Sequence, residues 1–241
     1  SLLDGLSKID DMVKLAKEHG MPAIALTDHG AMYGVIDFYS ACVKNGLKPI
    51  IGVELYIANR TRFDKEAGID NKRFHLTVLA KNNTGYQNLI KLTTAAHLEG
   101  YYYKPRVDKD LLRAHHEGLI ALSGCMAGEL ARTIQAGNKT KAEEIIHEYQ
   151  SIFGKENYYI EIMHHPEMAH FKEWRTALIE LSKKLAIPLV GTQDSHYLHP
   201  DDALAHKTLI AISTQSDIGE TALFSGNGTY HFISTKEALE L

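Results

Sequence analysis

Short apolar runs alternate with amphipathic stretches along most of this chain. The apolar runs predict buried strands at residues 22–27, 50–57, 74–80, 118–122, 158–162 and 189–192, with a short strand near 230–233. Between them, apolar residues at helical spacing predict helices at residues 8–19, 33–45, 85–98, 128–135, 141–153, 168–185 and 203–212. Asp108 is expected to cap a further short helix, another begins at Thr235, and the polar stretch 59–73 predicts an exposed loop or hairpin.

The alternation of strand and helix predicts an α/β fold with parallel strands and helical crossovers. A closed barrel and an open doubly wound sheet both satisfy this pattern. The early strands are not followed by a Gly-x-Gly-x-x-Gly or Walker-type loop, which disfavours a nucleotide-binding Rossmann site. Polar side chains follow strands at both ends of the sequence, and only a closed sheet brings such distant segments together. The barrel is therefore the favoured interpretation.

Carboxylate and imidazole side chains lie where several of these strands should end. Asp28 and His29 follow the first apolar run, Glu54 lies in the second, and Asp194 and His196 follow a late one. These are ligand types that bind Zn²⁺, Mn²⁺ or Fe²⁺. Other interpretations stay open: a capped turn for the first pair, an outward-facing carboxylate for Glu54, and a surface loop for the last pair.

Four further residues are candidates with structural alternatives of their own. His75 lies early in an apolar strand, where a histidine is more often a buried core residue than a ligand. Cys125 follows a strand and is either a soft ligand or a packed thiol. His165 belongs to a His-His pair after a strand, and Asp4 lies in a turn-like segment. One ion takes about four ligands, so this number of candidates predicts a cluster of two or three ions.

A cluster of this kind activates water and clamps the oxygens of a phosphoester during in-line attack. Phosphoester hydrolysis is therefore the reaction that the residues predict. Serine-type catalysis is disfavoured because the chain has no Gly-x-Ser-x-Gly motif.

Composition limits the remaining choices. A length of 241 residues allows one large α/β domain or two small ones. The net charge of −4 excludes strong attraction of the whole chain to nucleic acid but allows a local basic groove. The two cysteines are far apart, which fits a reducing, cytoplasmic setting, and the sequence has neither a signal peptide nor a membrane-spanning run. Of the 14 histidines, those away from strand ends are expected at the surface; they are His19, His97, His115, His116, His147, His170 and His206.

Several segments together resemble one known family. They are residues 1–5 (SLLDG), 25–30 (ALTDHG), 48–56 (KPIIGVELY), 74–81 (FHLTVLAK), 84–89 (TGYQNL), 122–125 (LSGC) and 192–197 (TQDSHY). They resemble the PHP (polymerase and histidinol phosphatase) domain of bacterial DNA polymerase III alpha subunits, and residues 98–106 (LEGYYYKPR) favour the polymerase branch. The resemblance implies one PHP domain over residues 1–241, with a distorted (β/α)7 TIM-like barrel and up to three divalent ions, zinc or manganese and alternatively iron.

The resemblance also implies roles for particular residues. The implied metal ligands are Asp4, His29, Glu54, His75, Cys125, His165, Asp194 and His196. Asp28 would orient His29, and Asp28, His29, Asp194 and His196 are the residues expected to act in catalysis. The family's opening His-x-His motif would precede Ser1, so the first barrel strand and two ligands are expected outside this sequence.

The implied activity is metal-dependent 3′–5′ exonuclease action within a protein that replicates DNA. The polymerase palm would follow residue 241, and DNA and other replisome subunits are the expected partners. Two alternatives remain: an inactive barrel that supports the polymerase, and a phosphatase of the histidinol-phosphate type.

Overall fold

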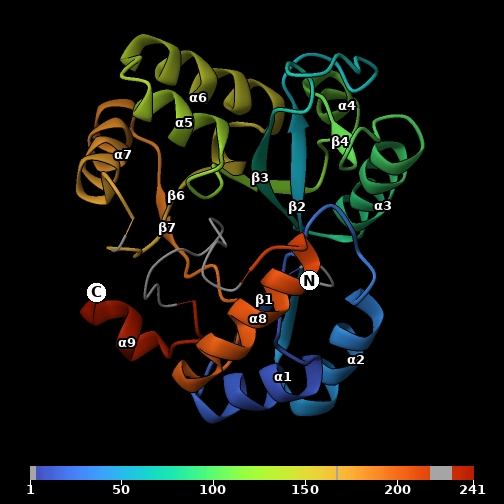
Figure 1. The fold of residues 1–241 in the computed structure, drawn as a ribbon, viewed down its shortest axis with the longest axis vertical. Helices are drawn as coiled ribbons and strands as arrows, with labels where there is room; N and C mark the ends of the chain where they lie inside the picture. Colours follow the sequence, from blue (N-terminus) through green and yellow to red (C-terminus); the bar gives the residue numbers. More distant parts are fainter. Residues whose placement is uncertain (1–3, 167, 218–229) are drawn as a thin grey trace.

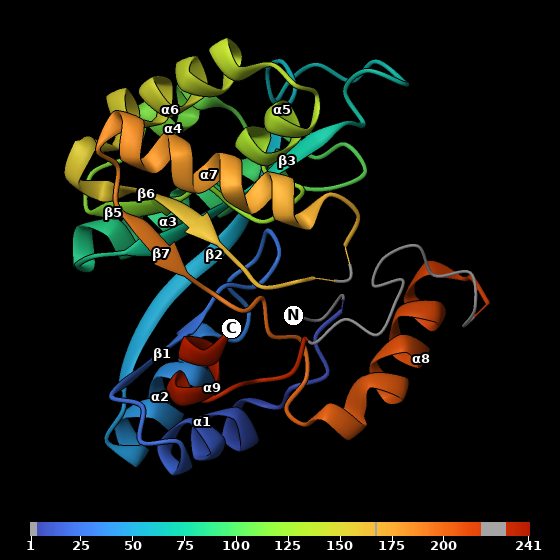
Figure 2. The same cartoon turned by 90° about the vertical axis from the view of Figure 1, so that its left-hand side faces the viewer.

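A strongly curved sheet built around one long strand organises this protein (Figures 1 and 2). The structure is a computed structural model that describes residues 4–166, 168–217 and 230–241. Within these residues the sheet has seven strands in the order β1-β2-β3-β5-β6-β7, and β4 pairs separately with β2. The strands are β1 (Ala23–Leu26), β2 (Lys48–Ala58), β3 (Arg73–Ala80), β4 (Arg106–Val107), β5 (Leu119–Leu122), β6 (Tyr158–Ile162) and β7 (Leu189–Gly191).

Helices surround this sheet. They are α1 (Ile9–Glu18), α2 (Val35–Asn45), α3 (Asn83–Leu98), α4 (Lys109–Ala114), α5 (Glu129–Gln135), α6 (Lys139–Phe153), α7 (Phe171–Leu185), α8 (Ala203–Thr214) and α9 (Thr235–Glu240). Figure 2 shows α1, α2 and α9 around β1 at one end and α5, α6 and α7 at the other. The cap predicted at Asp108 is confirmed, because its carboxylate accepts a hydrogen bond from Leu111 N at 2.9 Å. Among the described residues no helix is both long and apolar enough to cross a membrane.

The direction of β3 differs from the prediction of an all-parallel sheet. β3 is antiparallel to both β2 and β5, whereas the other adjacent strands are parallel to each other. The connection between β2 and β3, residues 59–72, contains no helix. Without a crossover helix the chain turns back beside β2, as in a hairpin. The strand predicted near 230–233 is also wrong, since His231 makes only an isolated bridge with Tyr197.

The core lies on both sides of the sheet, as a curved α/β barrel requires. In the second half of β2, consecutive side chains are buried on both faces; Leu55 and Tyr56, for example, are 1% and 4% exposed. The larger core cluster joins β2, β3, β5 and β6 to α3, α6 and α7 and includes Trp174. A smaller cluster around Phe38 packs α1 and α2 against β1. The predicted α/β barrel-like fold is confirmed in this form, as a curled half-barrel sheet.

One buried arginine holds the long 59–72 connection in place. Arg106 is fully buried, and its guanidinium donates four hydrogen bonds to backbone carbonyl groups. The acceptors are the carbonyl oxygens of Gly100, Asp70, Arg62 and Asp64, at 3.0, 2.8, 3.0 and 2.8 Å. A buried cation is stable only when its donors are satisfied in this way.

Candidate metal centre

The chain beyond β1 continues beside β2, and this extension places His29 next to Glu54. The backbones of these two residues form a parallel bridge, with Gly30 N donating to Glu54 O at 2.8 Å. Gly30 has a φ of +61°, and a Cβ there would lie 2.8 Å from Pro105 Cγ. Only glycine fits such a turn without strain. The sequence His-Gly thus lets the chain leave the sheet directly after the candidate ligand.

The antiparallel direction of β3 explains why His75 can belong to the same site. His75 lies near the beginning of β3, which would be the wrong end of a parallel strand. Because β3 runs antiparallel, its beginning lies beside Tyr56 near the end of β2. His75 Nδ1 contacts Glu54 Oε1, and the rings of His75 and Tyr56 lie 5.2 Å apart.

Glu54 lies at the centre of one donor group. Its carboxylate contacts His75, and His29 Nδ1 lies 3.7 Å from Glu54 Oε2. Cys125 Sγ lies 4.0 Å from Glu54 Oε1 and 3.6 Å from His75 Nδ1. Burial opposes ionisation of Glu54, but the hydrogen bond from His75 and the charges of His29 and His75 lower its pKa. The carboxylate is therefore held ionised inside the protein.

A second donor group forms around Asp4. His29 Nε2 lies 2.9 Å from Asp4 Oδ2, and His196 Nε2 lies 3.9 Å from the same oxygen. His196 Nδ1 donates to the carbonyl oxygen of Asp194 at 2.6 Å, which fixes the orientation of the imidazole ring. Leu6 N donates to His196 O at 2.7 Å. These contacts join the first and the last parts of the sequence, as predicted for polar side chains that follow strands at both ends of the chain.

His29 belongs to both groups, and the electrostatics reflect its position. Burial lowers its pKa, but the hydrogen bond with Asp4 and the charges of Glu54 and Asp4 outweigh burial and raise it to about 9. The same contacts hold the pKa of Asp4 well below its usual value, against the effect of its own burial. The donor atoms of Asp4, His29 and His196 lie within 4.8 Å of one another, and so do those of His29, Glu54 and His75.

Two buried polar atoms show whether the chemistry of the site suits a cation. Asp4 Oδ1 and His29 Nδ1 are buried and have no hydrogen-bond partner among the described residues. Buried polar atoms of this kind are costly unless something satisfies them. Imidazole nitrogens and carboxylate oxygens are donors for borderline divalent cations. The residues present therefore fit the divalent metal that the sequence predicts, and their individual metal roles stay predictions.

Cys125 and His165 lie around these groups. Burial and then the charges of Glu54 and Asp194 raise the pKa of the Cys125 thiol, so the thiol is protonated as long as no cation offsets those charges. His165 is buried and stacks on Tyr230, with ring centroids 4.6 Å apart. Burial is the largest of the effects that lower its pKa, which keeps the imidazole neutral, as a ligand must be.

Asp28 has a different position from the residues of the two groups. Its carbonyl oxygen accepts a hydrogen bond from Glu54 N at 3.0 Å, which continues the pairing of β1 with β2. Its carboxylate lies toward the start of α2, since a Cβ on Gly34 would be 3.6 Å from Asp28 Oδ2. The orienting role predicted for Asp28 stays a prediction.

Glu161 in β6 supports the site and was not among the residues predicted from the sequence. This residue is 2% exposed, and its carboxylate accepts hydrogen bonds from Thr192 Oγ1 at 2.7 Å, Gly124 N at 3.1 Å and Thr77 Oγ1 at 3.3 Å. Burial, and to a smaller degree repulsion from Glu54, raise its pKa to about 7. Glu161 thus ties together the segments that precede Cys125 and Asp194. A charged residue within an apolar strand, the signal used for Glu54, also marks this position.

His206 corrects a prediction. It was expected at the surface but is 1% exposed, and its Nε2 donates to the carbonyl oxygen of Asp4 at 2.7 Å. Its ring lies 5.5 Å from that of His196. Packing of α8 against the segment that carries His196 causes this burial, and helical spacing alone does not reveal it. His206 helps to hold Asp4 in the site.

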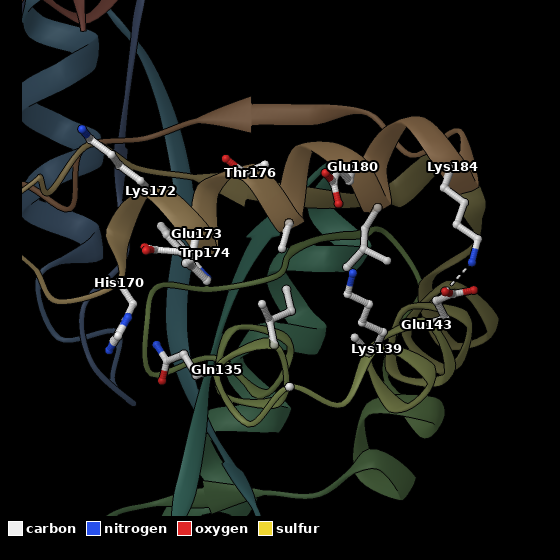
Figure 3. Close-up of a pocket in the computed structure, with 15 residues that line it drawn as sticks. Gln135, Lys139, Glu143, His170, Lys172, Glu173, Trp174, Thr176, Glu180 and Lys184 are labelled. Atoms are coloured by element: carbon white, nitrogen blue, oxygen red, sulfur yellow. Dashed lines mark hydrogen bonds and ion pairs between the residues drawn. The ribbon is translucent and has the colours of Figure 1, made fainter.

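A separate hollow of about 830 Å³ lies between α7 and the α5–α6 region (Figure 3). Trp174 and Leu181 of α7 contribute to its lining, and Lys184 pairs with Glu143 at one end, with Nζ and Oε1 2.5 Å apart. The residues that line it include none of the candidate ligands. This hollow belongs to the helical layer and is distinct from the candidate metal centre.

Comparison with known proteins agrees with this geometry. The sequence profile of the PHP domain matches residues 1–165. This chain belongs to the PHP domain family. The DNA polymerase III subunit alpha of Treponema pallidum is 47% identical over 218 residues, which cover 90% of this chain and 18% of the relative. That of Thermus aquaticus is 44% identical over 226 residues, which cover 91% of this chain and 18% of the relative.

This PHP domain also has a structural relative at low sequence identity. A protein from Bifidobacterium adolescentis assigned as a metal-dependent phosphoesterase matches with a TM-score of 0.52 and 11% identity, covering 81% of this chain and 85% of that chain. This likeness establishes the shared fold. The chain spans about a fifth of the length of the curated polymerase subunits that it matches.

Proposed function

We propose that this PHP domain hydrolyses phosphodiester bonds at the 3′ end of DNA with bound divalent metal ions. One observation carries the proposal: imidazole and carboxylate donors from remote parts of the chain meet in two groups that share His29. Zinc, manganese and iron all accept this mixture of donors, and up to three ions fit the number of candidate ligands.

Bound divalent ions would activate water and neutralise the charge that develops on the phosphate oxygens. The protein's own residues set the charge and the orientation of the groups around these ions. Asp4 and Glu54, both held ionised, present negative charge toward His29 from opposite sides of its ring. The carbonyl oxygen of Asp194 fixes the tautomer of His196, because that carbonyl can only accept the Nδ1 proton. His196 Nε2 then lies toward Asp4, 3.9 Å from Oδ2.

The choice of DNA as substrate rests on the relatives. Proteins 47% and 44% identical to this chain are DNA polymerase III alpha subunits. We therefore infer that this domain is part of such a subunit and acts beside a polymerase that extends DNA. Its partners would be the primer-template and other replisome subunits. Two unpaired cysteines, Cys42 and Cys125, support a reducing cytoplasmic location.

The test is metal analysis combined with a nuclease assay on the intact protein. His29→Ala should lose bound metal and hydrolysis of 5′-labelled single-stranded DNA, because His29 serves both donor groups. Asp194→Asn should also lose hydrolysis, and Asn tolerates the φ of +56° at this position. His147→Ala on the exposed face of α6 is the matched control and should retain both properties.

Two outcomes would contradict the proposal. Metal binding without hydrolysis of DNA, but with release of phosphate from small phosphomonoesters, would favour a phosphatase. Neither metal nor hydrolysis in a folded, intact protein would favour a structural support for the polymerase. Circular dichroism of each variant separates loss of the site from loss of the fold.

A further inference from the structure

Exposed aromatic side chains lie beside the candidate metal centre. Tyr33 is 70% exposed in the connection between β1 and α2, and Tyr101 is 53% exposed after α3. The ring of His97 lies between them, with centroids 6.4 Å from Tyr33 and 6.3 Å from Tyr101. We call these three residues the aromatic row. Exposed rings gathered in this way are uncommon unless they bind something.

The aromatic row is joined directly to the metal centre. His97 Nε2 donates to the carbonyl oxygen of Gly30 at 3.0 Å, and Gly30 immediately follows the candidate ligand His29. Pro105, four residues after Tyr101, packs against Gly30 as well. The row therefore begins at the rim of the site, on the side of the molecule that carries α2 and α3 (Figure 1).

Positive charge lies at the same rim. Lys104 Nζ lies 5.9 Å from the centroid of the Tyr56 ring, and Arg73 Cζ lies 5.4 Å from it. The ring of Tyr56 in turn stacks on His29 at 5.8 Å. The ring of Tyr56 thus lies between these two cationic side chains and the candidate ligand His29. These two side chains can bind the phosphates that flank a scissile bond. An acidic site without such cations would repel those phosphates.

The turn that presents Tyr101 is held rigidly. Tyr103 has a φ of +60°, which is uncommon for a residue with a bulky side chain, and Tyr102 N donates to Lys104 O at 3.1 Å. Buried Arg106 donates to the carbonyl oxygen of Gly100 and lies over the ring of Tyr102 at 5.3 Å. Strained turns persist where surrounding contacts fix them, and such sites are often functional. The backbone turn that carries Tyr101 is therefore fixed before any ligand binds.

We propose that the aromatic row seats the bases of single-stranded DNA beside the metal centre. Lys104 contacts the backbone phosphate next to the scissile bond. Stacking on aromatic rings tolerates every base and requires unpaired nucleotides, so the row favours a frayed or single-stranded 3′ end over a duplex. This inference rests on the proposed function, because it names how the same site recognises its substrate.

Two experiments on the intact protein test the inference. In the first, Tyr33→Leu and Tyr101→Leu should raise the KM for single-stranded DNA about tenfold, while Tyr33→Phe and Tyr101→Phe should keep it near the original value. Hydrolysis of bis(p-nitrophenyl) phosphate should be unchanged in all four variants, because this small diester does not reach the row. Tyr39→Leu changes a tyrosine that is 53% exposed on α2 outside the row, and it is the matched control.

The second experiment does not depend on hydrolysis. A single strand with 5-bromodeoxyuridine among its last three nucleotides and a phosphorothioate terminal linkage is photo-crosslinked, and the modified peptides are identified by mass spectrometry. Cross-links to the peptides that contain Tyr33 or Tyr101 are expected. Their absence, with cross-links elsewhere on the protein, overturns the inference even if DNA is hydrolysed. Cross-links at the row without hydrolysis would support the inference while the proposed activity fails.

Discussion

His29 and Glu54 are bridged through their backbones, and their side chains meet as well, with Nδ1 and Oε2 3.7 Å apart. The two residues are far apart in sequence, yet the parallel pairing of β1 with β2 sets them side by side. Since His29 also contacts Asp4, the position of one imidazole ring links both donor groups.

Metal should stabilise the protein through this relationship. A ligand at 100 times its Kd adds about 2.7 kcal/mol to the free energy of unfolding. We expect Mn²⁺ or Zn²⁺ at that excess to raise the thermal midpoint of the original protein and to leave that of Glu54→Gln nearly unchanged. Differential scanning calorimetry with and without chelator measures both. An equal metal-induced shift in Glu54→Gln and in the exposed control Glu117→Gln would show that Glu54 does not contribute to binding.

The turn after His29 gives a second prediction, with a matched pair of glycines. Gly30 and Gly20 have similar φ angles, +61° and +67°, but a Cβ on Gly20 would meet nothing within 4 Å. Gly20→Ala should therefore cost only the strain of the left-handed conformation, about 1 kcal/mol. Gly30→Ala should cost about 2 kcal/mol more, because its Cβ would press on Pro105 and Tyr56. Urea unfolding of both variants provides the comparison, and equal losses would refute the close-approach argument.

Glu161 should make stability depend on pH. Burial raises its pKa from an ordinary 4.5 to about 7. Below pH 4.5 the carboxyl group is neutral in the folded and unfolded states alike, and its contribution is fully present. As pH rises toward 7, the unfolded state ionises first, so the folded state loses up to about 3 kcal/mol of stability.

Glu161→Gln removes this titration and should flatten that part of the profile in the chelator-treated protein. The free energy of unfolding, measured in urea at intervals from pH 4 to 8, tests the expectation. Glu117→Gln is the exposed control, and its profile should follow that of the original protein. A profile for Glu161→Gln that falls just as steeply would mean that Glu161 is ionised throughout.

Arg106 should be among the residues most sensitive to substitution. Arg106→Met keeps much of the aliphatic volume but leaves the carbonyl oxygens of Asp70, Arg62 and Asp64 without their donor, whereas Gly100 O keeps the backbone hydrogen bond from Arg106 N. Each buried acceptor left unsatisfied costs about 1–3 kcal/mol, so a total loss of at least 3 kcal/mol is expected. Arg113→Met removes only surface ion pairs and should cost about 1 kcal/mol or less. Chemical denaturation distinguishes the two, and a small loss for Arg106→Met would show that water replaces the guanidinium.

Much of this protein follows from local sequence. Apolar periodicity places most strands and helices within a few residues, because each element buries one face or stripe and its sequence records that burial. The same logic marks Glu54, since an ionisable residue within an apolar run needs a partner. The Asp-His-Gly segment predicts a turn after a strand, and the glycine at its end does have a positive φ.

The direction of β3, the burial of His206 and the support that Glu161 gives depend on packing in three dimensions. Strand direction depends on how a connection crosses space, and the apolar pattern of β3 reads the same in either direction. His75 consequently reaches Glu54 from the beginning of its strand. His206 is buried because α8 packs against the segment that carries Asp4, which is distant in sequence. The residue types along the chain supply the donors of a metal site, and the packing of remote segments brings together those that meet.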